Sequence, residues 1–190
     1  YLKERLISAG QQVLVTREPG GTELGELIRK WILEDEHKRS SPEVEVLLMF
    51  AARAHHLDEV IRPALKEGAW ILCDRFTDAT IAYQGAGRGA SIAMIDDLKR
   101  HVQQGLEPDL TLLFDAPVEI GFSRIADRAP DNFEREEVAF YENVRSSYLE
   151  LADRYPDRIK RIDASASLHS VRQQIDHEVD LLRKRLVANG

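Results

Sequence analysis

The sequence predicts an α/β fold, a doubly wound parallel sheet with flanking helices. Short apolar runs alternate along the chain with longer segments whose apolar residues recur at helical spacing. Several of the apolar runs end in charged residues. Buried parallel strands have this pattern, because they leave the core at the edge of the sheet where ligands bind.

The first elements follow from turn residues and periodicity. Residues 1–6 are typical of a helix, and Gly10 separates them from a short buried strand at residues 13–16. After the turn at residues 19–21, apolar residues between Leu24 and Ile32 predict an amphipathic helix.

A longer helix and a second strand come next. Ser40-Ser41-Pro42-Glu43 marks a helix start, and we expect the helix to run to about Leu65 with a bend at Pro63. Gly68 ends it. Residues 70–73 then predict a buried parallel strand that ends at Asp74.

The middle of the chain continues the alternation. We expect a polar, glycine-rich loop at residues 84–89 and a helix from about Ile92 to Gln104. Residues 110–114 predict a strand that ends at Asp115, and a helix begins near Val118.

The last third completes the pattern. Residues 128–135 hold many charges and suit a mobile surface loop. A long helix at about 136–154, a strand at 159–162 and a final helix at 170–186 follow. We find no repeat or linker, so residues 1–190 are interpreted as a single domain.

Composition excludes several classes of protein. The formal net charge of -7 argues against a general nucleic-acid binder, which needs cations to release phosphate counterions. No apolar run approaches the ~20 residues that cross a bilayer, so we expect no membrane partner. The one cysteine, Cys73, cannot form an internal disulfide, which is compatible with a reducing cytoplasm.

Charged residues gather where the predicted strands end. Arg17, Glu18, Asp74, Arg75 and Asp115 follow three strands and should share one crevice of a parallel sheet. A single such charge could simply mark a strand leaving the core. Several together favour a ligand site, because buried carboxylates and arginines need partners.

Asp74-Arg75 is the sharpest of these pairs. A guanidinium offers a planar fork to phosphate oxygens, and a carboxylate can reach a hydrated Mg²⁺ or orient the arginine. The position at a strand end strengthens a dipeptide that is weak evidence by itself.

One helix offers a surface for a flat ring. Val46, Met49, Phe50 and Arg53 occupy neighbouring positions of one face, where Arg53 could donate to a carbonyl at the ring edge. The alternative is that the apolar residues are core and Arg53 is a solvated charge.

A second polar face lies at Thr80 and Gln84. These residues are four apart, and an amide can both donate and accept at the edge of a base. Ordinary capping of a short helix is the alternative. The nearby glycines do not form a dinucleotide fingerprint, because they follow no strand directly and their spacing is wrong.

Three further residues are interpreted as structural. His55 and His56 are adjacent and point in different directions, so they are surface or satisfied residues rather than a metal pair. Cys73 is most simply a small buried hydrophobe.

The sequence resembles bacterial thymidylate kinases over essentially its whole length. Five stretches occur in the order of that family with similar gaps: residues 16–22, 47–53, 72–76, 82–89 and 108–112. The resemblance implies a fold of the P-loop nucleoside monophosphate kinase type. It also implies ATP-dependent phosphorylation of dTMP to dTDP for dTTP synthesis, with Mg²⁺, by a cytoplasmic homodimer.

The resemblance also implies which residues bind dTMP. They would be Arg17, Glu18, Arg29, Met49, Phe50, Arg53, Thr80 and Gln84. Of the key arginines Arg53 and Arg75, one would contact the dTMP phosphate and one the thymine carbonyl. Glu18 and Arg17 would line the sugar and phosphate end. Because Met49 stands four residues before Arg53, where the family has an aromatic, either Met49 or Phe50 could cover thymine.

The ATP side follows in the same way. Asp74 would reach the metal through water, and Arg124 and Arg128 would be catalytic lid arginines in a loop at about 124–136. Ala164 and Ser165 would cup adenine, mostly through the backbone. Asn132 stands where the lid pattern has an arginine.

One family motif is not in this sequence. The phosphate loop Gly-x-x-x-x-Gly-Lys-Ser/Thr is missing, and relatives carry it just upstream of the helix that opens this chain. We expect the native protein to have it before Tyr1, since activity without it would be doubtful. Two alternatives stay open: a kinase for another pyrimidine nucleotide such as dUMP, or a catalytically dead nucleotide-binding fragment.

Overall fold

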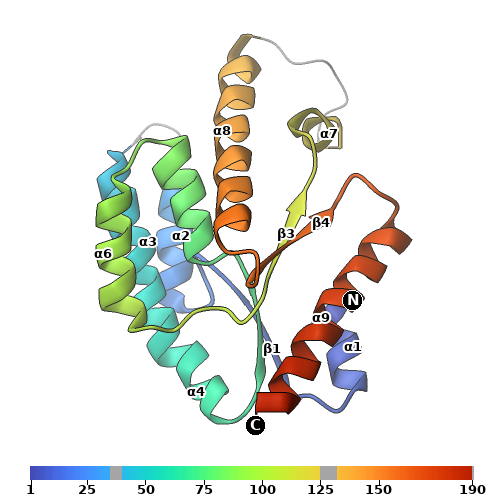
Figure 1. Ribbon diagram of the computed structural model, residues 1–190. Helices are drawn as coiled ribbons and strands as arrows, with labels where there is room; N and C mark the ends of the chain where they lie inside the picture. The colour runs from blue at the N-terminus through green and yellow to red at the C-terminus, as the bar shows by residue number, and fades with distance from the viewer. Residues whose placement is uncertain (35–39, 125–131, 190) are drawn as a thin grey trace. The chain divides into compact units, whose positions relative to one another are not determined.

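The computed structural model describes residues 1–34, 40–124 and 132–189, which divide between two compact units (Figure 1). The first unit spans residues 1–106 and the second residues 107–190. Each holds one pair of parallel strands with helices around it. The single domain expected over 1–190 stays a prediction.

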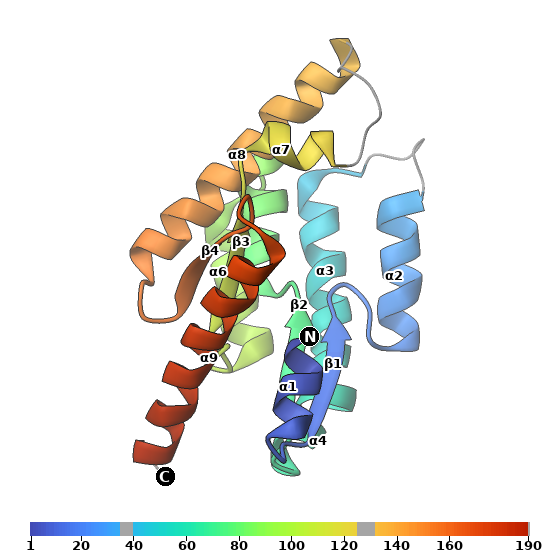
Figure 2. The same cartoon turned by 90° about the vertical axis from the view of Figure 1, so that its right-hand side faces the viewer.

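The strand pair of the first unit lies as the sequence predicts. β1 (Val13–Arg17) and β2 (Trp70–Asp74) run parallel, in a register that pairs the last residue of β1 with the last of β2 (Figure 2). The Trp70 indole N–H donates to the side-chain oxygen of Gln11 at 2.9 Å, at the start of the pair. Both carboxyl ends therefore open at one edge.

The early helices of the first unit lie where the spacing of apolar residues predicts them. α1 (Leu2–Ser8) and α2 (Glu23–Glu34) flank β1 in sequence, and α3 (Pro42–His56) starts at Ser41, whose hydroxyl accepts from the Val44 N–H. The helix continues from α3 through a π-helical segment, η1 (Leu57–Ile61), into α4 (Arg62–Lys66), and the expected bend at Pro63 stays a prediction. A proline without an N–H at this point cannot continue regular helical hydrogen bonding.

The glycine-rich loop expected at 84–89 is wrong at residues 84–87. Residues 77–87 are helical, as α5 (Thr77–Thr80) and the π-helical η2 (Ile81–Gly87), and α6 (Ile92–Gln103) follows. Gly85 is buried, and a Cβ added there would lie 2.6 Å from Ile92 Cδ1. The glycine thus permits close helix packing rather than a turn.

The core of the first unit lies between α3 and α6. Val46 and Phe50 of α3 pack with Ala90 and Ile95, and partly buried residues surround them: Ile81, Met94, Leu98 and Val102. This packing fixes α3 from one side. The remaining buried residues of α3 include Glu45, Arg53 and His56, which are not apolar.

The second unit is built around β3 (Thr111–Asp115) and β4 (Ile159–Asp163), again parallel. α8 (Asn132–Arg154) contacts both strands and α7 (Val118–Ser123), while α9 (Leu168–Asn189) packs on β4. The buried apolar residues of this unit come from α7, α8, β4 and α9: Val118, Val144, Leu151, Ala152, Ile159, Ile162, Ile175, Val179 and Leu182.

The expected surface loop at 128–135 is only partly described. Residues 132–135 belong to α8, so the loop prediction is wrong there, whereas 128–131 lie outside the described residues. The charged residues that suggested a loop are equally compatible with the first turns of a helix. No helix in the described part of the chain is both long and apolar enough to cross a bilayer.

Candidate functional site

The ends of β1 and β2 bring four of the predicted site residues to one edge. Arg17 and Asp74 are register partners, and the Glu18 N–H donates to the Asp74 carbonyl at 2.9 Å. Glu18 is buried at 3% exposure, while Arg17, Asp74 and Arg75 are exposed. The edge thus combines a buried carboxylate with an exposed rim of mixed charge.

Glu18 forms a buried ion pair with Arg53 of α3. Arg53 Nε lies 2.7 Å from Glu18 Oε2, and Arg53 is 1% exposed. The alternative interpretation of Arg53 as a solvated charge is therefore wrong. Two charges taken this far from water are tolerated only when they pair closely and their other polar atoms find partners.

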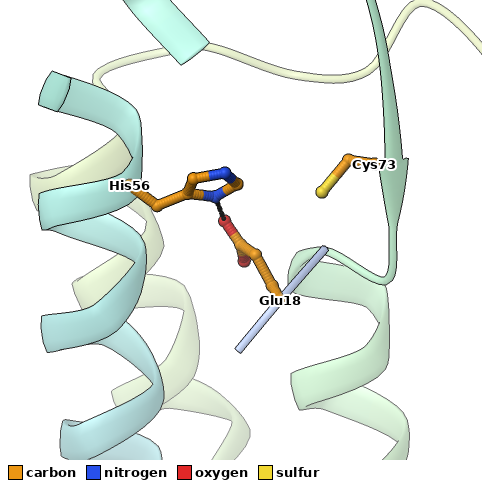
Figure 3. A group of neighbouring side chains, drawn as sticks. All are labelled: Glu18, His56 and Cys73. Atoms are coloured by element: carbon orange, nitrogen blue, oxygen red, sulfur yellow. Dashed lines mark hydrogen bonds and ion pairs between the residues drawn. The ribbon is translucent and has the colours of Figure 1, made fainter. Parts of the chain in front are cut away.

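His56 holds the other oxygen of Glu18. Its Nδ1 lies 3.0 Å from Glu18 Oε1 (Figure 3), and its Nε2 lies 2.7 Å from Thr16 Oγ1. Because a carboxylate only accepts, Nδ1 donates to Glu18, and Nε2 shares the second hydrogen bond with the Thr16 hydroxyl. The interpretation of His56 as a satisfied residue is confirmed, and His55 is exposed.

Glu18, His56 and Cys73 also form a potential metal cluster, with ligand atoms all within 4.8 Å of one another (Figure 3). Each group is already engaged, since the Cys73 thiol donates to the Arg75 carbonyl at 3.1 Å. Burial, and then the charge of Glu18, raise the pKa of the Cys73 thiol far above its ordinary value. A neutral thiol and an arginine cation on Glu18 favour a hydrogen-bond network over a metal site.

Arg53 retains one donor group without a partner among the described residues. Its second terminal nitrogen, NH2, donates to Thr80 Oγ1 at 3.1 Å, while NH1 is buried and unpaired. The guanidinium lies over the Phe50 ring at 4.6 Å and over the Phe76 ring at 5.0 Å. A buried N–H without an acceptor is costly, so NH1 is poised to meet an external one.

Gln84 complements Arg53 with an unpaired acceptor. Its Nε2 donates to Glu45 Oε2 at 3.3 Å, and its Oε1 is buried with no partner in the described chain. Glu45 is 4% exposed, and its other oxygen pairs with Arg88. Sequence reasoning identified Gln84 but missed Glu45, although Glu45 is eight residues before Arg53 on the same helix.

The two unpaired atoms are one donor and one acceptor. Thr80 and Gln84 stand one helical turn apart, and Thr80 contacts Arg53 directly. A donor from Arg53 and an acceptor from Gln84 match a ligand edge with an acceptor beside a donor. A carbonyl next to a ring N–H, as in a cyclic imide, has this pattern.

Arg75 is held in an unusual backbone conformation. Its φ of 67° is in the left-handed region, which costs a non-glycine residue ~1 kcal/mol or more. The guanidinium lies over the Tyr83 ring at 4.5 Å. Tyr83, like Phe76, was missed by sequence reasoning, because helix periodicity does not reveal which aromatic ring meets an arginine of another segment.

The turn after β1 is fixed by charged residues of α2. Glu26 Oε2 lies 2.8 Å from Arg17, and Glu26 Oε1 accepts from the Gly21 N–H at 3.1 Å. These hydrogen bonds, that from Arg17 first, lower the pKa of the Glu26 carboxyl. Arg29 donates to the Pro19 carbonyl at 3.3 Å. Arg17 and Arg29 are thus brought to the same turn, as predicted, and Glu26 was missed.

The second unit contains Asp115 and the residues predicted for the ATP side. Asp115 forms a bidentate ion pair with Arg145 of α8. Arg145 Nε lies 2.7 Å from Asp115 Oδ1, and Arg145 NH2 lies 3.2 Å from Asp115 Oδ2. The Ala164 N–H donates to the Asp115 carbonyl, and the Ser165 N–H donates to Asp163 Oδ1 at 2.9 Å.

Of the two predicted lid arginines, only one is described. Arg124 is exposed at the end of α7. Arg128 lies outside the described residues.

Comparison with known proteins gives a consistent result. The family model for thymidylate kinase matches residues 1–175. A thymidylate kinase of Pseudomonas putida (strain GB-1) is 53% identical, over 93% of this chain and 84% of that protein. One from Methylococcus capsulatus is 52% identical, over 96% and 87%. A crystal structure of thymidylate kinase from Ehrlichia chaffeensis is similar with a TM-score of 0.71 at 30% identity, over 92% of this chain and 86% of that one.

Proposed function

The chain belongs to the thymidylate kinase family, and from that premise we propose how its residues bind dTMP and align it for phosphoryl transfer. Its fold is the α/β fold of P-loop nucleoside monophosphate kinases, and its reaction converts ATP and dTMP into ADP and dTDP. A phosphate oxygen of dTMP attacks the γ-phosphorus of ATP in line with the departing ADP. The protein contributes alignment and charge neutralisation rather than a covalent intermediate.

The unpaired atoms of Arg53 and Gln84 carry the proposal for the base. Thymine presents the O4 carbonyl beside the N3–H, an acceptor next to a donor. Arg53 NH1 is a buried donor and Gln84 Oε1 a buried acceptor, and both lack partners within the described chain. We assign O4 to Arg53 and N3–H to Gln84, with the Thr80 hydroxyl holding the guanidinium beside them.

The faces of the base would meet apolar side chains. Met49 is 7% exposed and lies between Glu45 and Arg53 on the buried face of α3. Phe50 supports the guanidinium of Arg53 from the core, and Phe76 supports it from the strand-end loop. In this assignment Met49 contacts the thymine ring, and Phe50 and Phe76 act by holding Arg53 in place.

The phosphate and sugar end lies at the exposed rim. Arg75 has a left-handed backbone conformation, and its guanidinium can donate hydrogen bonds to phosphate oxygens. Arg17 and Arg29 sit at the turn after β1, and Glu18 fixes that turn to Arg53. We propose that Arg75 binds the dTMP phosphate, and that Arg17 and Arg29 line the same end.

Asp74 is the residue that would hold Mg²⁺, through water. It offers exposed carboxylate oxygens, the hard donors that Mg²⁺ prefers, at the end of β2. The ion would supply charge neutralisation for the phosphates. Asp74 would keep the hydrated ion close to the residue that binds the dTMP phosphate, since Arg75 follows it directly.

The ATP side rests on the family resemblance. We assign Arg124 and Arg128 to the lid, and the backbone of Ala164 and Ser165 to adenine. The turn that begins at Asp163 supports this, because the Asp163 carboxylate fixes the Ser165 N–H in a defined loop. From the same resemblance we propose that the enzyme works as a homodimer in the cytoplasm.

Binding of three nucleotides tests the base assignment. We expect calorimetry to show dTMP and dUMP binding to the full-length protein, because uracil has the same O4 and N3–H edge. Binding of dCMP should be weaker by about tenfold or more, because its base would leave buried polar atoms of the site without matching partners. Arg53→Met and Gln84→Leu should each weaken dTMP binding. Equal affinity for dTMP and dCMP would contradict the assignment.

A further inference from the structure

We propose that Glu45 determines the preference for thymine over cytosine by fixing the orientation of the Gln84 amide. The inference rests on the proposed reading of the base by Arg53 and Gln84. It gives a role in specificity to a residue that need not touch the nucleotide. Glu45 is a positioning residue in this account.

The chemistry of the contact sets the orientation. Gln84 has one donor end and one acceptor end, and rotation of the amide exchanges them. Gln84 Nε2 lies 3.3 Å from Glu45 Oε2, in a region where Glu45 is 4% and Gln84 7% exposed. A carboxylate has no proton to donate, so only the amide N–H₂ can face it. The acceptor Oε1 must then face away from Glu45.

Arg88 occupies the second oxygen of Glu45. Its guanidinium pairs with Glu45 Oε1, the oxygen that Gln84 does not use. The Arg88 side chain is 38% exposed, whereas that of Glu45 is 5% exposed, so the arginine links the buried carboxylate to the surface. Both oxygens of Glu45 therefore act as acceptors, one for Gln84 and one for Arg88.

The orientation has a direct consequence for the base. Thymine presents N3–H, which needs an acceptor, and cytosine presents an unprotonated N3, which needs a donor. With Glu45 present, Gln84 offers Oε1 and therefore matches thymine. If the amide could rotate freely, its N–H₂ would match cytosine equally well, and discrimination at N3 would be lost.

A merely structural role for Glu45 makes a different prediction. If Glu45 only stabilised the packing of α3 against η2, its loss would weaken the binding of dTMP, dUMP and dCMP to the same extent. A role in amide orientation changes the ratio of affinities instead. It changes the ratio of dTMP to dCMP, and it leaves that of dTMP to dUMP alone, because these two bases share the same edge.

The test is nucleotide binding by Glu45→Gln in the full-length protein. Glutamine is nearly isosteric but can donate as well as accept, so Gln84 gains a second orientation. We expect the ratio of Kd values, dCMP over dTMP, to fall on the order of tenfold. The ratio of dUMP to dTMP should stay constant. Glu43→Gln is the matched control, since it removes the same charge from an exposed residue of the same helix.

The outcomes separate this inference from the proposed function. An unchanged dCMP to dTMP ratio in Glu45→Gln would overturn the role of Glu45, while wild-type preference for dTMP would leave the proposed function standing. A wild-type protein without that preference would overturn the proposed function first.

Thermal unfolding shows whether Glu45→Gln is folded. If it is not, Glu45→Met removes the carboxylate with an apolar side chain of similar length. A similar fall in the ratio of Kd values, dCMP over dTMP, in Glu45→Met would support the proposal, and an unchanged ratio would reject it.

Discussion

At the scale of single residues, the site depends on one buried carboxylate. Glu18 accepts from Arg53 through one oxygen and from His56 through the other. Both oxygens are therefore fixed, and Arg53 can present its remaining nitrogen in only one direction. The bonds among these side chains, more than the backbone, determine where the unpaired nitrogen of Arg53 points.

Glu18→Gln should be strongly destabilising. The substitution leaves the Arg53 cation buried with a neutral partner, and breaking a buried ion pair costs about 3 kcal/mol of unfolding free energy. Urea denaturation measures the change. Glu26→Gln, in an exposed pair with Arg17, is the control and should cost less than ~1 kcal/mol. Similar losses for both variants would show that burial of Glu18 is not decisive.

Cys73 gives a prediction of pH dependence. Its pKa is raised in the folded protein, so the native thiol keeps its proton at a pH where the unfolded thiol loses it. The unfolded state then binds fewer protons, and stability falls as pH rises above the ordinary thiol pKa of about 8.5.

Alkylation measures the same effect. At pH 8.5 we expect iodoacetamide to modify native Cys73 at least tenfold more slowly, to order of magnitude, than the urea-unfolded chain. The Cys73→Ser variant should show no alkylation by iodoacetamide, because Cys73 is the one cysteine of the sequence. Equal rates in the two states would contradict the raised pKa of the folded thiol.

At the scale of elements, the strands could be predicted almost to the residue. Their apolar runs are short and are ended by charged residues, so pattern and position agree. The error at 84–89 has a physical cause, because glycine is typical of turns but is also required where helices approach closely. Gly85 is of the second kind, and only its contact with Ile92 distinguishes the two.

Two helical glycines should therefore respond differently to alanine. A Cβ at Gly25 would lie 2.6 Å from the Gly20 carbonyl oxygen, a backbone atom that cannot easily move. A Cβ at Gly85 would meet Ile92 Cδ1, the end of a flexible side chain. We expect Gly25→Ala to cost about 1–3 kcal/mol and to weaken dTMP binding. Gly85→Ala should cost less, and urea titration of both variants compares them. A larger loss of stability for Gly85→Ala than for Gly25→Ala would contradict the close packing of α2 on the turn at Gly20.

At the scale of the whole molecule, family and reaction could be predicted from ordered motifs, but the hydrogen bonds of the site could not. Arg53, Thr80 and Gln84 could be proposed because each is polar within a stretch that resembles the family. Glu45, Phe76 and Tyr83 were missed because their roles depend on which segments meet in space. The overall charge is also a poor guide, since a chain of net charge -7 gathers Arg17, Arg29, Arg53 and Arg75 in one unit.

The most direct test of the central claim is a crystal structure of the full-length protein with dTMP bound. The account predicts that Arg53 NH1 lies within about 3.2 Å of thymine O4 and that Gln84 Oε1 lies within the same distance of N3. Both atoms that are unpaired in the free chain would then have partners. A base bound elsewhere, with Arg53 NH1 and Gln84 Oε1 still unpaired, would contradict the account.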